Sequence, residues 1–224
     1  MRKFLWPVML LLAGCAIPPR EVAPPAAPPE KPAVPGEPWT VTSSQLDVRV
    51  YRDGPMQKLG HNHVITTAAL TGTIQMREPV AASSFELSLP LESLVVDDDA
   101  ARARAGADFS APVPEKDREG TRRNMLGDKV LNAALQPELR LASESISGGA
   151  GQYEAKVRVS IAGSEHVVTA PFTVVIEGDH LEARAELHLT HEDVGLVPFT
   201  VALGVLKVRD DFEVDLTLAA RRGS

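Results

Sequence analysis

Hydrophobic and polar residues alternate along much of the chain between residues 39 and 224. The alternating segments are Leu46–Val50, Phe85–Leu91, Tyr153–Ile161, Leu181–Leu189 and Phe212–Leu218. Successive side chains of a strand point to opposite faces, so a period of two gives each segment one apolar face and one hydrated face. Such strands are typical of antiparallel sheets that pack one face on a core. The pattern therefore predicts an antiparallel β-domain.

Turn signals separate these segments at short intervals. They are Asp53-Gly54-Pro55, Ser147-Gly148-Gly149, Ala162-Gly163-Ser164 and Glu177-Gly178-Asp179. Short strands at even spacing are typical of a sandwich or a closed barrel. We therefore expect a single all-β domain of about eight strands over residues 39–224.

One stretch in the middle of the domain lacks the alternation. Residues 97–120 are rich in charged and small side chains, and the run Asp97-Asp98-Asp99 lacks the ligand spacing of a calcium loop, which favours a hydrated turn. Residues Thr121 to Leu135 then predict a helix capped by Thr121 and ended by Pro137. Its apolar stripe contains Met125, Leu126, Val130 and Leu131. This one inserted helix is expected to form a plug or lid across one barrel end.

Residues 1–15 have the organisation of a bacterial export signal. Arg2 and Lys3 precede an apolar run, Phe4–Ala13, that is too short to span a bilayer as a helix. The run ends in Leu12-Ala13-Gly14-Cys15, which resembles a lipobox, and Cys15 is the only cysteine of the chain. We expect lipidation at Cys15 and anchoring to a membrane, the alternative being an ordinary secretory signal with a chance cysteine. The neutral Ala16 resembles lipoproteins sent to the outer membrane.

Residues 16–38 form a proline-rich linker, with 9 of the 18 prolines of the chain. Such a segment behaves as a semi-rigid polyproline II spacer with a rise of about 3.1 Å per residue, which gives a reach of roughly 70 Å. A docking site for a proline-binding partner is the alternative. The linker is expected to hold the folded domain away from the membrane.

Charge and composition exclude several classes of function. The whole chain has a net charge of −7, which argues against nucleic-acid binding because that requires a basic surface. A single cysteine excludes an internal disulfide framework and a cysteine-built zinc or iron–sulfur site. The sequence has no Gly-x-Ser-x-Gly elbow and no glycine-rich phosphate loop before a helix, so we expect no enzyme.

Several segments resemble the YceI-like family in their order and spacing. They are Leu91-Glu92-Ser93-Leu94, the following arginine-rich loop and helix, Gln136–Ser143, Val157–Gly163, Val167–Val174, His191–Leu196 and Asp211–Leu216. The resemblance covers nearly all of residues 39–222. It implies a lipocalin-like antiparallel β-barrel on the periplasmic face of the bacterial envelope, which binds or carries a hydrophobic chain such as a polyisoprenoid or a quinone-like lipid. The sequence departs from the family pattern at Lys58–Ile65, in Asp193-Val194-Gly195, and in the longer loop of residues 100–118.

The parity of the strands predicts which side chains face the interior. The predicted ligand-binding residues are Val48, Val50, Leu70, Ile74, Phe85, Leu87, Leu89, Tyr153, Val157, Phe172, Leu187 and Leu189. Residues 39–224 contain only 8 aromatic side chains, so the lining is expected to be mostly aliphatic, which suits an isoprenoid or acyl chain. A solid core without a cavity, acting as a scaffold in an envelope complex, is the alternative. Homodimerisation is compatible with the sequence.

His61-Asn62-His63 predicts a second kind of site. On a strand, positions two apart share a face, so both imidazoles could bind one metal ion or a haem, with His191 as the best third ligand. A redox accessory role would follow. The alternative is that His61 and His63 form hydrogen bonds near the barrel mouth. The arginines near the helix could meet a diphosphate or carboxylate headgroup, or form salt bridges at the surface (Arg102, Arg104, Arg118, Arg122 and Arg123).

Overall fold

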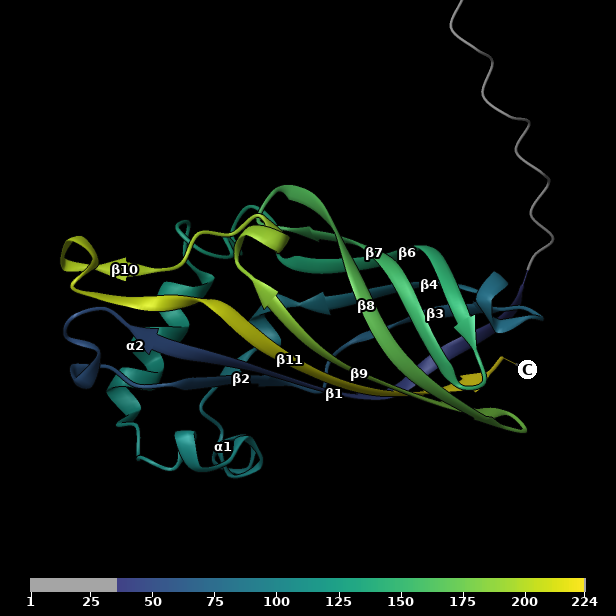
Figure 1. The fold of residues 1–224 in the computed structure, drawn as a ribbon, viewed down its shortest axis with the longest axis horizontal. Coiled ribbons are helices and arrows are strands. Elements are labelled where there is room, and N and C mark those ends of the chain that lie inside the picture. Colours follow the sequence, from purple (N-terminus) through teal and green to yellow (C-terminus); the bar gives the residue numbers. More distant parts are fainter. Residues whose placement is uncertain (1–35, 224) are drawn as a thin grey trace, which may run out of the picture. The chain divides into compact units, whose positions relative to one another are not determined.

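A computed structural model describes residues 36–223. Eight strands of this part of the chain form a closed antiparallel barrel (Figure 1). In order around the ring they are β1 (Glu37–Asp53), β3 (Thr71–Met76), β4 (Ser84–Pro90), β6 (Glu138–Gly149), β7 (Gln152–Ile161), β8 (Ser164–Glu177), β9 (His180–Thr190) and β11 (Leu206–Arg222). Pairing of β11 with β1 closes the ring. The prediction of an all-β antiparallel barrel of about eight strands is confirmed. Strand β1 begins two residues before the predicted start of the domain.

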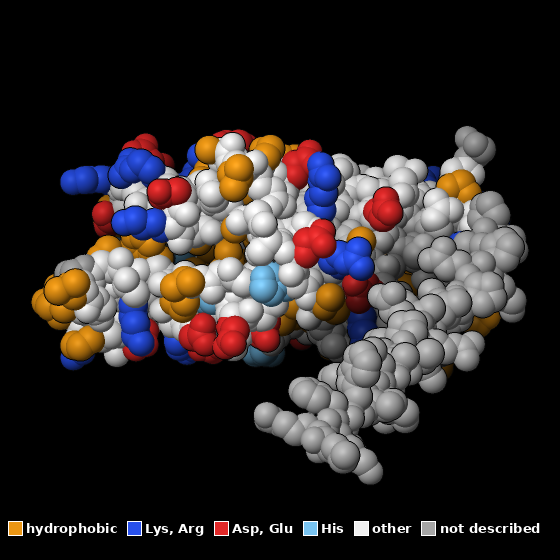
Figure 2. Space-filling model, turned by 90° about the horizontal axis from the view of Figure 1, so that it is seen from above, with side chains coloured by type: hydrophobic (Ala, Val, Ile, Leu, Met, Phe, Trp, Pro, Cys, Tyr) orange, Lys and Arg blue, Asp and Glu red, His pale blue; other side chains and the backbone are white. Residues whose placement is uncertain are grey.

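Three short strands extend the wall at one end. The first half of β1 pairs with β3, and its second half pairs with β2 (His63–Thr67), which in turn pairs with β5 (Val95–Val96). Strand β10 (Thr200–Val201) is added to the start of β11. At this end, apolar side chains gather on the surface near β10, and charged side chains of both signs are scattered over the described part of the visible face (Figure 2).

Tight turns fix the register of three hairpins. Ala150-Gly151 and Ala162-Gly163 have φ angles of 53°, 81°, 52° and 83°, the left-handed conformation that two-residue type I′ turns require. Gly178, with a φ of 62°, begins the turn between β8 and β9. The turns at residues 162–163 and 178–179 agree with the sequence, whereas the predicted turn at 147–149 is displaced, because β6 continues through Gly149.

The insertion contains two helices where the sequence predicted one. Helix α1 covers Asp99–Ala105 and helix α2 covers Glu115–Leu126, so the predicted helix over 121–135 has the wrong limits. Gly120 lies inside α2 and does not end it, since an interior glycine costs a helix only about 1 kcal/mol. Gly127 ends the helix, and residues 128–135 form turns from which Leu131 packs into the core. Helix α2 lies beside β5 at one end of the barrel.

The run Asp97-Asp98-Asp99 is not a simple hydrated turn, because Asp98 and Asp99 are exposed at the start of α1 but Asp97 is buried. Asp98 caps α1, because its carboxylate accepts hydrogen bonds from the amides of Ala100 and Ala101. Asp97 is fully buried and has a φ of 58°. Short 3-10 helices connect other elements: η1 (Gln57–Leu59), η2 (Val80–Ala82), η3 (Leu91–Ser93), η4 (Ala107–Phe109), η5 (Glu192–Val194) and η6 (Ala202–Gly204).

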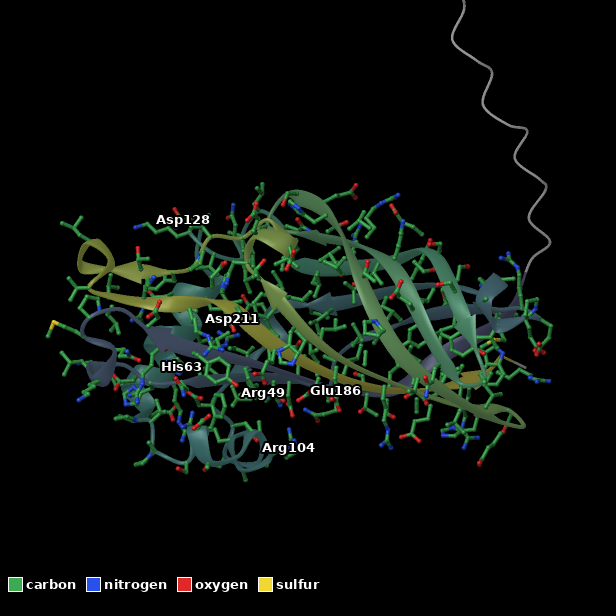
Figure 3. All side chains as sticks on the ribbon, in the orientation of Figure 1. Arg49, His63, Arg104, Asp128, Glu186 and Asp211 are labelled. Atoms are coloured by element: carbon green, nitrogen blue, oxygen red, sulfur yellow. The ribbon has the colours of Figure 1, made fainter. Side chains whose placement is uncertain are left out.

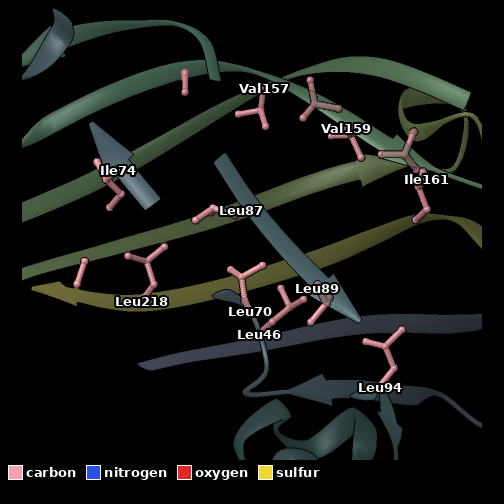
Figure 4. Close-up of a cluster of buried hydrophobic side chains, with 14 of the residues drawn as sticks. Leu46, Leu70, Ile74, Leu87, Leu89, Leu94, Val157, Val159, Ile161 and Leu218 are labelled. Atoms are coloured by element: carbon pink, nitrogen blue, oxygen red, sulfur yellow. The ribbon is translucent and has the colours of Figure 1, made fainter. Parts of the chain in front are cut away.

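The main hydrophobic core lies inside the barrel, where side chains from many strands point toward a common interior (Figure 4). A second cluster of Val64, Ala101 and Phe109 attaches α1 and η4 to the outside of β2. Within residues 36–223, none of the helices has both the length and the apolar character needed to cross a bilayer. The predicted signal peptide, lipidation at Cys15 and residues 16–35 of the linker lie outside the described residues.

Candidate functional site: a hydrophobic cavity along the barrel

A cavity of about 570 Å³ occupies the barrel interior. It reaches from Met76, which pairs with Glu37 at one end of β1, to Lys207, which pairs with Asp53 at the other end. The 17 residues of β1 measure about 50 Å along the strand at roughly 3.3 Å per residue, which is roughly 40 Å along the barrel axis because barrel strands tilt by about 35–45°. A modest volume spread over this length makes a narrow tunnel, which fits an extended chain better than a compact molecule.

Eleven of the twelve predicted ligand-binding residues line this cavity. They are Val48, Val50, Leu70, Ile74, Phe85, Leu87, Leu89, Val157, Phe172, Leu187 and Leu189. The exception, Tyr153, stacks on Phe172 with ring centroids 5.6 Å apart and packs against the core without lining the cavity. The interior is therefore an apolar channel, as strand parity predicted, and it contains open volume.

Other lining residues were not among the predicted site residues. Strand β11 contributes Phe212, Val214, Leu216 and Leu218, whose parity is visible in the sequence. Helix α2 contributes Thr121, Asn124 and Met125. Met125 belongs to the apolar stripe that the sequence predicted for the inserted helix. Thr121 and Asn124 were missed as lining residues, because the helix was expected to begin at Thr121 and its true limits, Glu115–Leu126, show which face meets the barrel.

His63 is a polar residue in the wall of this cavity, and it is the first residue of β2 (Figure 3). Its Nδ1 is 2.6 Å from Oδ2 of Asp97, and its Nε2 is 3.4 Å from the hydroxyl of Thr121 on α2. The Asp97 carboxylate also accepts hydrogen bonds from the amide of Val64, at 3.0 Å, and from the Arg102 guanidinium, at 2.5 Å. Asp97 thus joins α1, β2 and the cavity wall in one network.

The charge of Asp97 is stabilised where it is buried. Burial alone would raise the pKa of this carboxyl group. The hydrogen bonds from His63, the Val64 amide and Arg102 outweigh burial and hold the pKa of Asp97 below its usual range. Asp97 is therefore a carboxylate at neutral pH, and a carboxylate can only accept hydrogen bonds.

The other two histidines of the predicted metal site also line the cavity. The rings of His61 and His63 meet edge to face with centroids 6.1 Å apart. His191 is 7% exposed, its Nδ1 lies 2.5 Å from the carbonyl oxygen of Asp210, and its ring meets Phe212 edge to face. Among residues 36–223, no three His, Cys, Asp or Glu side chains come close enough together to hold a metal ion. His61, His63 and His191 are therefore not assembled into a three-ligand site.

The arginines of the insertion are engaged with protein groups. Arg102 pairs with Asp97 and Arg104 pairs with Asp47 on the outer face of β1 (Figure 3), while Arg118 pairs with Asp99 and Arg122 with Glu92. None of these four arginines, nor Arg123, is among the residues that line the cavity. The pairs of Arg104, Arg118 and Arg122 are salt bridges at the surface, as the alternative predicted, whereas the pair of Arg102 with Asp97 is buried. These arginines do not form a headgroup site at the cavity.

Comparisons with known proteins agree with this architecture. Residues 39–220 match the family described as YceI-like domain. BcnA from Burkholderia cenocepacia is similar in structure, with a TM-score of 0.54 and 14% sequence identity over 79% of this chain and 95% of that protein. The Campylobacter jejuni YceI protein has a TM-score of 0.51 and 8% identity over 69% of this chain and 82% of its own. Such low identities show a shared fold alone. A comparison with curated proteins found no match.

Proposed function

The chain belongs to the YceI-like domain family, and from this premise we propose that it binds and carries a long hydrophobic chain, such as a polyisoprenoid, inside its barrel. The single observation that carries the proposal is the narrow apolar cavity of about 570 Å³. This volume lies within the roughly 300–1,000 Å³ of typical ligand pockets. An aliphatic wall gives contact area, which is what a chain without polar groups needs.

The proposed activity is binding without catalysis. Leu87, Val157 and Leu189 are representative of the wall, and aliphatic side chains of this kind offer no acid, base or nucleophile. His63 is a polar lining residue that pairs with Asp97, and Arg102 holds Asp97 within the fold. A scaffold role would not require an open cavity, so the cavity favours binding over that alternative.

We extend the proposal to the place where the protein works. The lipobox-like Leu12-Ala13-Gly14-Cys15 supports lipidation at Cys15, and the neutral Ala16 supports sorting to the outer membrane. The proline-rich linker supports a barrel held in the periplasm at a distance from the membrane. The anchored barrel would then exchange its ligand within the bacterial envelope.

Organic extraction and mass spectrometry of the purified full-length protein test this function. The expected result is close to one equivalent of a long-chain lipid for each protein, or uptake of one equivalent of added geranylgeraniol by protein purified empty. Protein that contains no lipid and takes up no geranylgeraniol would overturn the proposal and favour the scaffold role.

A further inference from the structure

We propose that the cavity selects a ligand whose head donates a hydrogen bond, namely the hydroxyl of a long-chain alcohol or phenol, which Nε2 of His63 accepts. This inference rests on the proposed function, because it concerns the polar end of the chain that the barrel binds. It is carried by the hydrogen bonding of His63, by its place in the cavity wall and by the pairing of Lys207 and Arg184, two of the lining cations, with carboxylates.

The tautomer of His63 follows from its partner. Oδ2 of Asp97 lies 2.6 Å from Nδ1 of His63, and the carboxylate cannot donate a hydrogen bond. Nδ1 therefore carries the proton. In the neutral imidazole this leaves Nε2 as an acceptor. The fully buried carboxylate is itself held by Arg102 and by the amide of Val64, so the orientation of the ring is fixed by the fold.

The accepting nitrogen lies beside other polar groups of the cavity. Thr121 is 3.4 Å from Nε2, which is near the outer limit of a hydrogen bond. A ligand hydroxyl that donates to Nε2 could accept in turn from the hydroxyl of Thr121. Asn124 and His61 also line the cavity. The same polar region thus contains an acceptor for the ligand proton and donors for the ligand oxygen.

His191 has the same tautomer at a similar level of the barrel. Its Nδ1 lies 2.5 Å from the carbonyl oxygen of Asp210, which can only accept, so its Nε2 is an acceptor in the neutral ring. The strand register places His63 opposite Val50, Val50 opposite Phe212, and the ring of His191 against Phe212. Two acceptor imidazoles therefore lie around one level of the wall, which favours a donating head over an accepting one.

Two of the three cations of the cavity wall are paired with carboxylates and so do not favour a phosphorylated head. Lys207 pairs with Asp53 at 2.9 Å, and Arg184 pairs with Glu182 at 2.7 Å. The third lining cation, Arg52, is exposed to solvent and donates to the carbonyl oxygen of Gly60 at 2.6 Å. An anionic phosphate would need charged donors that are free to form paired hydrogen bonds. A neutral hydroxyl needs only the acceptor that His63 supplies.

Three probes with one hydrocarbon chain test the inference: geranylgeraniol, its methyl ether and geranylgeranyl phosphate. Each is titrated into the full-length protein to displace the apolar dye 1-N-phenylnaphthylamine. The wild type should bind the alcohol about five-fold more tightly than the ether, the effect expected of one neutral hydrogen bond, and more tightly than the phosphate. Equal affinity for alcohol and ether, or preference for the phosphate, would overturn the inference while leaving hydrophobic binding intact. Failure to bind any of the three probes would overturn the proposed function instead.

Three variants identify the residue responsible. His63→Phe should bind the alcohol and the ether equally, whereas His188→Phe, on the exposed face of β9, should retain the wild-type preference. Thr121→Val leaves Asp97 and His63 paired and should reduce the preference in part, so it tests the site even if His63→Phe does not fold. A full preference for the alcohol in folded His63→Phe would contradict the assignment to His63.

Discussion

Arg102 and Asp97 form an ion pair of 2.5 Å in which the two side chains are only 8% and 0% exposed. Arg102 also donates to the carbonyl oxygens of Asn62 and Ala111, so its guanidinium joins α1, the segment before β2 and the segment before α2. The ion pair therefore fixes the insertion to the barrel and orients His63 through Asp97.

Arg102→Met should destabilise the domain strongly. The substitution leaves the buried Asp97 carboxylate without its cation, and removing one partner of a buried ion pair costs about 3–5 kcal/mol. Arg104→Met is the matched control, because Arg104 is 48% exposed in its pair with Asp47 and should cost no more than about 1 kcal/mol. Urea unfolding at pH 7 measures both. If both variants lost a similarly small free energy of unfolding, the Arg102–Asp97 pair would not be what fixes the insertion to the barrel.

Val157→Trp should block the cavity. Val157 is buried on β7 and lines the channel, so an indole at this position takes up space that the ligand needs. We expect affinity for geranylgeraniol to fall by about ten-fold or more, since a steric clash excludes a ligand more effectively than a lost contact weakens it. Lys156→Trp, on the outer face of the same strand, should bind as the wild type does. The dye-displacement assay measures the affinities, and a thermal melt checks that both variants fold. Unchanged affinity in folded Val157→Trp would place the ligand outside the channel.

Asp47 should make the stability depend on pH in the acid range. Burial would raise its pKa, but hydrogen bonds from Arg104, Thr66 and Gln45 outweigh burial and lower it. A carboxyl group with a lowered pKa in the folded state stabilises that state above its unfolded pKa of about 3.9, and this contribution is lost as the pH falls through the folded pKa.

Asp47→Asn tests this dependence. The free energy of unfolding of the wild type should exceed that of the variant by a constant amount above about pH 5, and the difference should narrow as the pH falls below about 4. Urea unfolding from pH 6 to pH 2 measures the difference. A difference that stays constant through this range would show that Asp47 does not titrate with folding.

Cys15→Ser should release the protein from the membrane. The predicted acyl chains depend on the thiol of Cys15, and several chains give firm anchoring where one chain is marginal. We expect the wild type to partition into the detergent phase and to incorporate labelled palmitate, and the variant to do neither. A variant that partitions and labels as the wild type does would refute lipidation at this residue.

The barrel could be predicted from the sequence because strand parity is a local signal. In β7, residues 153–161 alternate, and the strand observed is Gln152–Ile161. The cavity lining followed from the same parity, with Tyr153 as the exception. Tyr153 has the parity of the lining residues, yet its ring stacks on Phe172 and does not line the channel. This stacking depends on the neighbouring strand β8, so the local sequence pattern gives no signal of it.

The insertion could not be predicted in detail because its structure depends on distant partners. Asp97 is in a run of three aspartates, which on composition alone belongs in water. It is buried because Arg102, His63 and the Val64 amide together satisfy its carboxylate. In the same way, the helix was predicted to begin at Thr121, after Gly120, but α2 begins at Glu115 and continues through Gly120. The sequence therefore predicted only part of the polar site in the cavity: it indicated the histidines of His61-Asn62-His63 but not the Asp97 carboxylate that pairs with His63.

Native mass spectrometry of the full-length protein with geranylgeraniol tests directly whether the barrel holds a long hydrophobic chain. We expect a single added mass of one alcohol for each barrel, which Val157→Trp lacks and Lys156→Trp retains. A protein observed only at its ligand-free mass, with geranylgeraniol in excess, would contradict the claim that this barrel holds a long hydrophobic chain.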